Sequence, residues 1–209
     1  MQTVNISYNV YEFQELSAEA KENVREWYLD GQESSVFTNL VDMDLQMLFP
    51  NSDLEVEYSL GYCQGDGLNI YGDVHSRDIL NLINGNVAGD LFKDYRNIFT
   101  AKEIKTLKFY QSVAGLLKMP HNPTIYSYCY AKRASPCDTW REDLEDLCNA
   151  NWDLIDRFEE VVKNVFTLLC DQNEEAGYNY FYEIDDETLE DVCEANNYHF
   201  LADGSYFSM

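Results

Sequence analysis

Between Thr139 and Cys170, apolar and acidic positions recur with helical spacing on two opposite faces. At about 100° per residue, one face collects the apolar residues Leu144, Leu147, Cys148, Ile155, Phe158, Val162, Val165, Phe166 and Leu169. The other face collects the carboxylates Glu142, Glu145, Asp146, Asp153, Asp156, Glu160 and Asp171. Thr139 and Glu142 have the spacing of a capping box, whereas Asn149 to Asn151 has weak helix propensity. The pattern therefore predicts a long amphipathic helical segment and leaves open whether it is one helix or two.

Shorter patterns predict the remaining elements. Alternating apolar and polar positions, or runs rich in tyrosine, predict strands over residues 4–10, 54–62, 68–74, 124–130 and 178–184. Helical spacing and capping residues predict helices over residues 17–31, 35–49, 76–83, 91–95, 100–118 and 186–195. A turn at Gln64–Gly67 joins two of the strands, and residues 198–207 form a closing hairpin.

Strands and helices that do not alternate regularly predict an α+β fold. We expect an antiparallel, hairpin-containing sheet covered by helices, one of them the long acidic helix. A single domain over residues 1–209 is expected, and a helical acidic subdomain over residues 137–196 is left open.

Composition indicates a folded protein. The 209 residues are 45% hydrophobic and include 16 Tyr, whereas disordered chains combine high charge with few aromatic residues. The six cysteines form no Cys-x-x-Cys pair, and we interpret them as reduced thiols of the core. No secretory signal and no apolar run near the ~20 residues of a membrane span is present, so we expect a cytoplasmic protein.

The net charge of −24 is distributed unevenly. Residues 12–57 carry 12 acidic residues against two basic ones, and residues 138–196 carry 19 against three. Residues 58–137 between these two acidic blocks carry a net charge of +3. A field of this sign repels nucleic acid and anionic membranes, and it attracts basic protein surfaces.

No motif predicts catalysis, a metal ion or a cofactor. Gln64-Gly65-Asp66-Gly67 lacks the lysine and the spacing of a phosphate-binding loop, so it is interpreted as a turn. His75, His121 and His199 have no zinc-ligand spacing, and the acids from Asp185 onward lack the residue order of a calcium loop. An enzyme of unrecognised type, with a pocket near the Gln64–Gly67 turn, remains an alternative.

Three segments carry a family resemblance: residues 11–21, the turn at Gln64–Gly67, and residues 194–204. Together they resemble a family of small acidic proteins encoded by bacteriophages and mobile elements. The resemblance implies no catalytic residue. It implies a viral setting, in which acidic proteins that block nucleic-acid-binding host defences (anti-CRISPR and anti-restriction proteins) are a recurrent class.

The prediction for function is a non-enzymatic inhibitor that acts as a DNA mimic on a basic, nucleic-acid-binding host protein, either a nuclease or a CRISPR effector. It is expected to act in the host cytoplasm and to contact neither nucleic acid nor membrane directly. The predicted partner-binding residues are Glu142, Glu145, Asp146, Asp153, Asp156 and Glu160, with Asp42, Asp44, Asp186, Glu187, Glu190 and Asp191 in support. The alternatives are a regulatory module that binds a protein through shape and aromatic contacts, with its charge serving solubility, and an adaptation to high salt.

Overall fold

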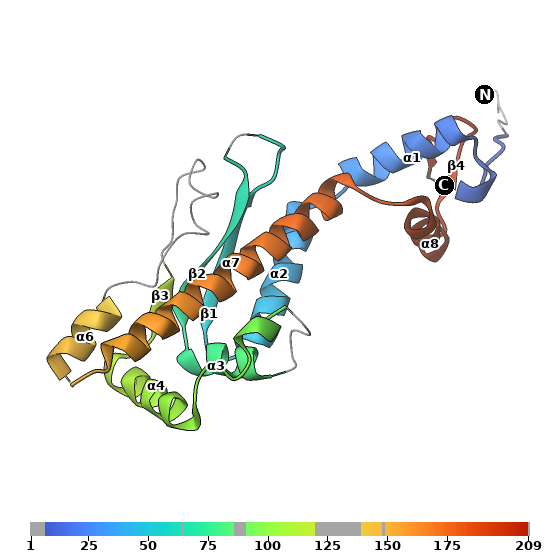
Figure 1. The fold of residues 1–209 in the computed structure, drawn as a ribbon. Coiled ribbons are helices and arrows are strands. Elements are labelled where there is room, and N and C mark those ends of the chain that lie inside the picture. Colours follow the sequence, from blue (N-terminus) through green and yellow to red (C-terminus); the bar gives the residue numbers. More distant parts are fainter. Residues whose placement is uncertain (1–6, 64, 86–90, 120–138, 148, 209) are drawn as a thin grey trace. The chain divides into compact units, whose positions relative to one another are not determined.

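The computed structural model describes residues 7–63, 65–85, 91–119, 139–147 and 149–208 (Figure 1). The chain divides into two compact units, which we call the terminal unit (residues 1–36 with 177–209) and the central unit (residues 37–176). Helices α2 (Ser34–Leu48) and α7 (Trp152–Tyr182) each contribute residues to both units. This division does not coincide with residues 137–196, because α6 lies in the central unit and α8 in the terminal unit.

The central unit contains an antiparallel sheet in the order β1-β2-β3. Its strands are β1 (Asp53–Ser59), β2 (Gly67–Val74) and β3 (Leu117–Met119). The hairpin between β1 and β2 pairs Val56 with Ile70 and Ser59 with Gly67. Of the predicted turn, Gly65 and Asp66 lie in the connection between the strands, Gly67 begins β2, and Gln64 lies outside the described residues. The predicted α+β class with an antiparallel, hairpin-containing sheet is confirmed.

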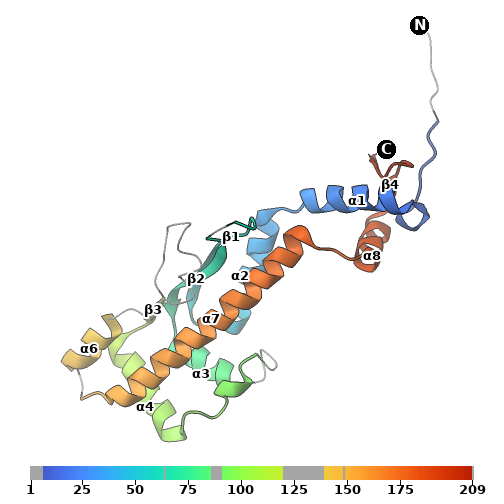
Figure 2. The ribbon, with the colours of Figure 1, turned by 45° about the horizontal axis from the view of Figure 1, so that its top comes forward.

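The central unit also contains the helices α3 (Ser76–Asn84), α4 (Ala101–Ala114), α6 (Thr139–Leu147) and the larger part of α7, with a short 3₁₀ turn, η2 (Lys93–Tyr95). In Figures 1 and 2, α7 runs along the sheet. Thr100 and Glu103 form the predicted capping box of α4. The helix predicted to reach Lys118 ends earlier, because Gly115 adopts a positive φ of 78° and the chain turns into β3.

The predicted core face of the acidic segment is confirmed where its side chains are described. Ile155, Phe158, Val162, Val165 and Leu169 are all buried. The segment forms two helices, because α6 ends at Leu147 and α7 begins at Trp152. Asn151 stabilises the second start: its side-chain Oδ1 accepts from the Leu154 N–H at 3.3 Å, and its N–H donates to the Tyr110 hydroxyl of α4 at 2.7 Å.

The strand predicted over residues 178–184 is wrong, because α7 continues as a helix to Tyr182. Tyrosines occur at alternate positions there, which is typical of a strand. In the helix, Tyr178 and Tyr182 stand four residues apart with ring centroids at 6.2 Å, so the same residues pack along a helical face.

The terminal unit combines both ends of the chain. It contains η1 (Phe13–Glu15), α1 (Ala18–Asp30), α8 (Asp186–Asn196) and the short antiparallel pair β4 (His199–Phe200) and β5 (Tyr206–Phe207). Ser17 caps α1 as predicted, with its hydroxyl accepting from the Ala20 N–H at 3.2 Å. The buried core residues are Phe13, Leu16, Ala20, Val24, Leu189, Cys193 and Phe200.

Aromatic contacts extend this small core. Trp27 stacks on Tyr206 with ring centroids at 4.7 Å and an interplanar angle of 11°, and Tyr198 meets both rings edge-on. A Cβ at Gly204 would collide with the Ala20 carbonyl oxygen, and its φ of 87° also favours glycine. The closing hairpin therefore packs directly against α1.

Three further predictions have mixed outcomes. In the strand predicted over residues 4–10, residues 7–10 have no regular structure and the others lie outside the described residues. The strand predicted over residues 124–130 also lies outside them. Cys170 and Cys193 are buried thiols as predicted, whereas Cys63 is exposed and is therefore not a core thiol. Among the described residues, no helix is long and apolar enough to cross a membrane.

Candidate acidic interaction surface

An exposed line of four carboxylates runs along α1. Glu19, Glu22, Glu26 and Asp30 are spaced three, four and four residues apart, which places them on one side of the helix. Ala20 and Val24 occupy the opposite side and are buried. The sequence predictions included none of these four residues as site residues, although their spacing was a signal that could have identified them.

Helix α8 exposes a second set of carboxylates. The predicted residues Asp186, Glu187 and Asp191 are exposed and Glu190 is half-buried, whereas Leu189 and Cys193 face the core. Asp185 caps the helix by accepting from the Thr188 N–H at 2.7 Å, and this hydrogen bond lowers the pKa of the Asp185 carboxyl. Acids at this end are favourable because a helix N-terminus carries partial positive charge.

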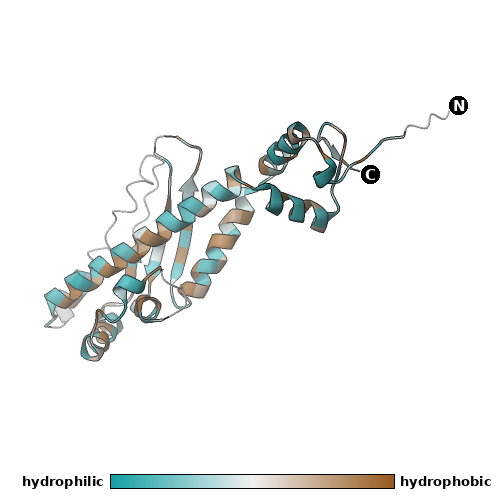
Figure 3. Cartoon of the chain, turned by 45° about the vertical axis from the view of Figure 1, so that its right-hand side comes forward, coloured by the Kyte–Doolittle hydropathy of each residue, from teal (hydrophilic) through white to brown (hydrophobic). Residues whose placement is uncertain are grey.

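Arg25 lies where the two acidic helices meet. Its guanidinium forms ion pairs with Glu22 of α1 and Asp186 of α8, and its Nε donates to the Ile184 carbonyl at 3.2 Å. Asp186 was predicted to contact a partner, but its carboxylate forms an ion pair with Arg25 of the same chain. Glu22 of α1 and Asp186 of α8 therefore lie close together at Arg25, and both helices are predominantly hydrophilic in Figure 3.

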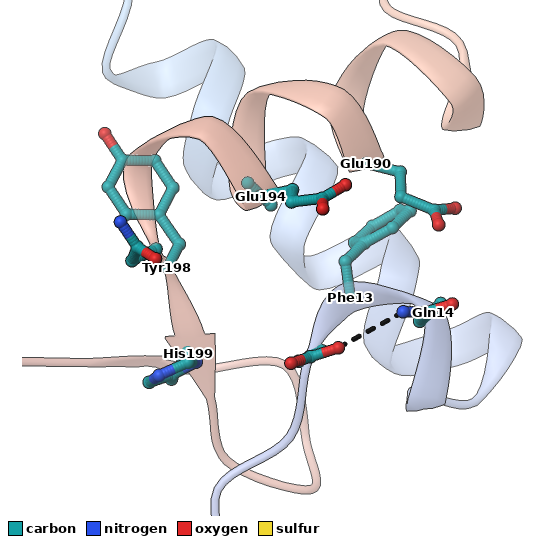
Figure 4. A pocket seen from close by; sticks show the side chains of 9 residues that line it. Phe13, Gln14, Glu190, Glu194, Tyr198 and His199 are labelled. Carbon is teal, nitrogen blue, oxygen red and sulfur yellow. Dashed lines mark hydrogen bonds between the residues drawn. The ribbon is translucent and has the colours of Figure 1, made fainter.

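A small cavity of about 110 Å³ lies against α8 in the terminal unit (Figure 4). Glu190 and Glu194 reach it from successive turns of α8, Phe13 and Gln14 from η1, and His199 from β4. Glu12 also lines it and accepts from Gln14 Nε2 at 3.1 Å. Among the residues that the structure describes, no three His, Cys, Asp or Glu side chains are grouped to hold a metal ion.

The acidic face predicted for residues 139–170 is exposed but divided. Glu142 and Glu145 lie on α6, whereas Asp153, Asp156 and Glu160 lie on α7, and all five are exposed. The side chain of Asp146 lies outside the described residues. The sequence left open whether this segment is one helix or two, and the break between α6 and α7 divides its acidic face into two groups.

Arg141 of α6 pairs with carboxylates of α7. Its Nε donates to both carboxylate oxygens of Glu159 at 3.0 Å, and its Nη2 contacts Asp156 Oδ1 at 2.6 Å. These hydrogen bonds raise the pKa of the Arg141 guanidinium, with the largest effect coming from Glu159. Part of the negative charge of Asp156 is therefore balanced within the protein.

The two supporting residues of α2 differ in exposure. Asp44 is exposed, whereas Asp42 is half-buried, and burial together with the charge of Glu55 raises the pKa of the Asp42 carboxyl. Asp42 is consequently less suited than Asp44 to meet a partner.

Twelve predicted residues are thus divided between the units. Asp186, Glu187, Glu190 and Asp191 lie in the terminal unit, and the others lie in the central unit. The N-terminal and C-terminal acidic blocks meet only in part: α1 joins α8 in a unit that contains 15 acidic residues and two basic ones, Lys21 and Arg25. That unit carries a net charge of −13, more than half of the total of −24.

Comparison of the chain with family models, with curated proteins and with solved structures finds no match. The resemblance to acidic phage and mobile-element proteins therefore stays a prediction.

Proposed function

We propose that this protein is a non-enzymatic inhibitor of the phage type that covers the basic nucleic-acid-binding surface of a host nuclease or CRISPR effector. Its carboxylates take the place of nucleic-acid phosphates. The observation that carries this proposal is the charge of the terminal unit, in which α1 meets α8 and which contains 15 acidic residues and only two basic ones.

The spacing of the carboxylates supports a binding surface that includes both helices. The four carboxylates of α1 span 11 residues, or about 16 Å at ~1.5 Å per residue, which is roughly one charge per 5 Å. Duplex DNA carries one charge per ~1.7 Å of its axis. One helix alone is too dilute to resemble DNA. The carboxylates of α8, which adjoin those of α1 at Arg25, bring the spacing closer to that of the duplex.

The cost of this charge also favours a binding role. Like charges in such number destabilise a compact state through repulsion, and the small core around Phe200 and Trp27 has to offset it. A basic partner relieves the repulsion when it binds. Opposite charge also accelerates association, and the effect weakens as salt rises.

The test neutralises carboxylates of the terminal unit that are exposed on α1 and α8. The variant Glu19→Gln/Glu187→Gln/Asp191→Asn removes three charges and leaves both partners of Arg25 intact. We expect weaker inhibition of DNA cleavage by a panel of purified restriction nucleases and CRISPR effectors. The difference in inhibition from the wild type should be largest at low salt. At higher ionic strength, salt screens the attraction between these carboxylates and a basic partner, so their removal matters less.

The matched control Glu142→Gln/Glu145→Gln/Asp153→Asn removes the same charge from exposed positions of the central unit. Inhibition close to that of the wild type is expected for it. Equal losses in the two variants would show that net charge alone matters. Unchanged inhibition in the first variant would refute the proposal.

A second candidate function is a protein-binding module that uses shape and apolar contacts. The observation that favours it is an apolar line on α2, where Leu40, Met43 and Met47 are 50%, 67% and 65% exposed. Exposed methionines adapt to varied partner surfaces. Measuring the affinity for a partner at increasing ionic strength distinguishes the two candidate functions, because an apolar interface keeps its affinity as ionic strength rises.

A further inference from the structure

The C-terminal end of α7 carries four aromatic residues in the terminal unit. They are Tyr178, Tyr180, Phe181 and Tyr182, and their rings form a contiguous series with centroids 4.9 to 6.3 Å apart. Tyr182 is the last residue of this series and of the helix, and its side chain is 42% exposed. The ring of Tyr182 is therefore within reach of solvent and of a partner.

Tyr182 lines two adjoining open cavities. One has a volume of about 670 Å³. Its charged and tyrosine lining residues are Arg25, Tyr28, Tyr180, Tyr182, Glu183 and Asp185. The other has a volume of about 540 Å³ and is lined by Glu26, Leu29, Asp30, Phe181 and Tyr182. Each cavity thus combines aromatic rings with two carboxylates.

Both cavities are electrostatically suited to a cation. Glu183 follows the end of α7 directly, where the C-terminus of the helix carries partial negative charge, whereas the Asp185 carboxylate caps the start of α8. The last turn of α7 contains no basic residue to balance that charge. Glu26 and Asp30 belong to the exposed acidic line of α1, so the second cavity continues the acidic surface.

The protein already binds one guanidinium of its own beside these groups. Arg25 lines the larger cavity, donates from Nε to the Ile184 carbonyl and forms ion pairs with two carboxylates. Arg25 is paired with Glu22 and Asp186 outside the lining, and within the lining the two acidic residues Glu183 and Asp185 outnumber this one cation. The carboxylates and aromatic rings not used by Arg25 offer comparable surroundings to a further cationic side chain.

We propose that the two cavities that share Tyr182 bind arginine or lysine side chains of an extended basic segment of a partner protein, with the Tyr182 ring between them. In an extended chain, residues i and i+2 point to the same side, about 7 Å apart. Two adjoining cavities therefore suit cationic residues at alternate positions. This inference rests on the proposed function for the source of the segment, since a basic nucleic-acid-binding protein supplies such sequences.

A labelled peptide of alternating arginine and glycine serves as the probe, and its citrulline counterpart serves as the neutral control. We expect the arginine peptide to bind the full chain and the citrulline peptide to bind far more weakly. Tyr182→Leu should reduce the affinity about five- to tenfold, because the aromatic face is lost. Tyr182→Phe keeps the ring and should stay within about twofold of the wild type.

Tyr8→Leu is the matched control, because Tyr8 is an exposed tyrosine of the same unit that lines neither cavity. Its affinity should equal that of the wild type, and circular dichroism verifies that every variant is folded. Equal binding of the citrulline peptide, unchanged affinity in Tyr182→Leu, or an equal loss in Tyr8→Leu would each overturn the inference.

The carboxylate variant Glu19→Gln/Glu187→Gln/Asp191→Asn distinguishes this inference from the proposed function, since none of its positions lines either cavity. If that variant loses nuclease inhibition while Tyr182→Leu binds the peptide normally, the inference fails and the proposed function stands. If Tyr182→Leu loses the peptide while the carboxylate variant inhibits normally, the inference stands and the proposed function fails.

Discussion

The guanidinium of Arg25 forms an ion pair with the carboxylate of Asp186, a residue 161 positions further along the chain. The same guanidinium contacts Glu22 within α1 and the Ile184 carbonyl before α8. A single cation thus connects two helices that carry the most acidic part of the protein. Without it, the carboxylates of α1 and α8 would face each other with little compensation.

We predict that Arg25→Met destabilises the terminal unit by about 1 kcal/mol, the usual value for a few partly exposed polar contacts. The variant also adds one net negative charge where repulsion is already large. Amide hydrogen exchange should accelerate in α8 and remain unchanged in α3 of the central unit. Arg157→Met is the control, since Arg157 pairs with Glu103 in the central unit. Equal acceleration of α8 in both variants would contradict the prediction.

Asp78 organises the start of α3 in the central unit. Although only 1% exposed, it accepts hydrogen bonds from the Asn51 N–H at 2.9 Å, the Asn51 side-chain amide at 2.6 Å and the Ser52 hydroxyl at 2.7 Å. Asp78→Ala leaves three donors without their acceptor. We predict a loss of about 2–4 kcal/mol in the free energy of unfolding, measured with urea.

Asp73→Asn is the corresponding control on β2. Asp73 pairs across the hairpin with Asp53, so two like charges lie opposite each other. On its other side Asp73 lies opposite Lys118 of β3, so the loss of one repulsive and one attractive neighbour should leave stability nearly unchanged. If Asp73→Asn lowered the free energy of unfolding as much as Asp78→Ala, the loss of a negative charge, rather than the loss of the hydrogen bonds to Asp78, would explain the destabilisation.

The pKa of Glu103 predicts how the free energy of unfolding depends on pH at acidic pH. The Thr100 backbone N–H, the Thr100 hydroxyl and the Arg157 guanidinium, in that order, lower the pKa of Glu103 from 4.5 to about 2. Because the folded state favours the ionised carboxyl, this contribution to stability is complete above pH 4.5 and is lost as pH falls toward 2. Glu103→Gln should remove that part of the pH dependence.

Urea unfolding of the wild type and of Glu103→Gln, from neutral pH down to pH 2, measures the difference. The two free energies should converge as Glu103 becomes protonated. Asp44→Asn, at an exposed position of α2, is the control for the removal of one carboxyl group. Parallel curves for the wild type and Glu103→Gln would rule out the assignment.

Gly72 is required by the pairing of β1 with β2. Its φ is 125°, and a Cβ at this position would collide with the Asp53 carbonyl oxygen of the neighbouring strand. We predict that Gly72→Ala lowers the free energy of unfolding by about 2 kcal/mol or more. Gly61→Ala is the control, because no atom lies within 4 Å of its Cβ position. Similar stability of both variants would contradict the prediction.

Much of the fold was predictable because local chemistry determined it. Ser17 and Thr100 cap helices, and the apolar spacing from Ile155 to Leu169 identifies a buried face. The tyrosines near Tyr180 misled the prediction, since alternation over a few residues does not distinguish a strand from the end of a long helix. The division of the acidic segment at Asn151 depended on a contact with Tyr110, 41 residues away.

The sequence by itself determined the sign and the amount of charge, the helical faces that carry it and the residues that terminate the helices. These properties depend on composition and on spacing within one element. Only the tertiary structure decided which acidic elements adjoin, because α1 and α8 are brought together by the core of Val24, Leu189 and Phe200 and by Arg25. It likewise decided that Tyr182 lines two cavities bordered by carboxylates from distant segments. Such neighbours depend on long-range packing, which the spacing of residues along the chain does not encode.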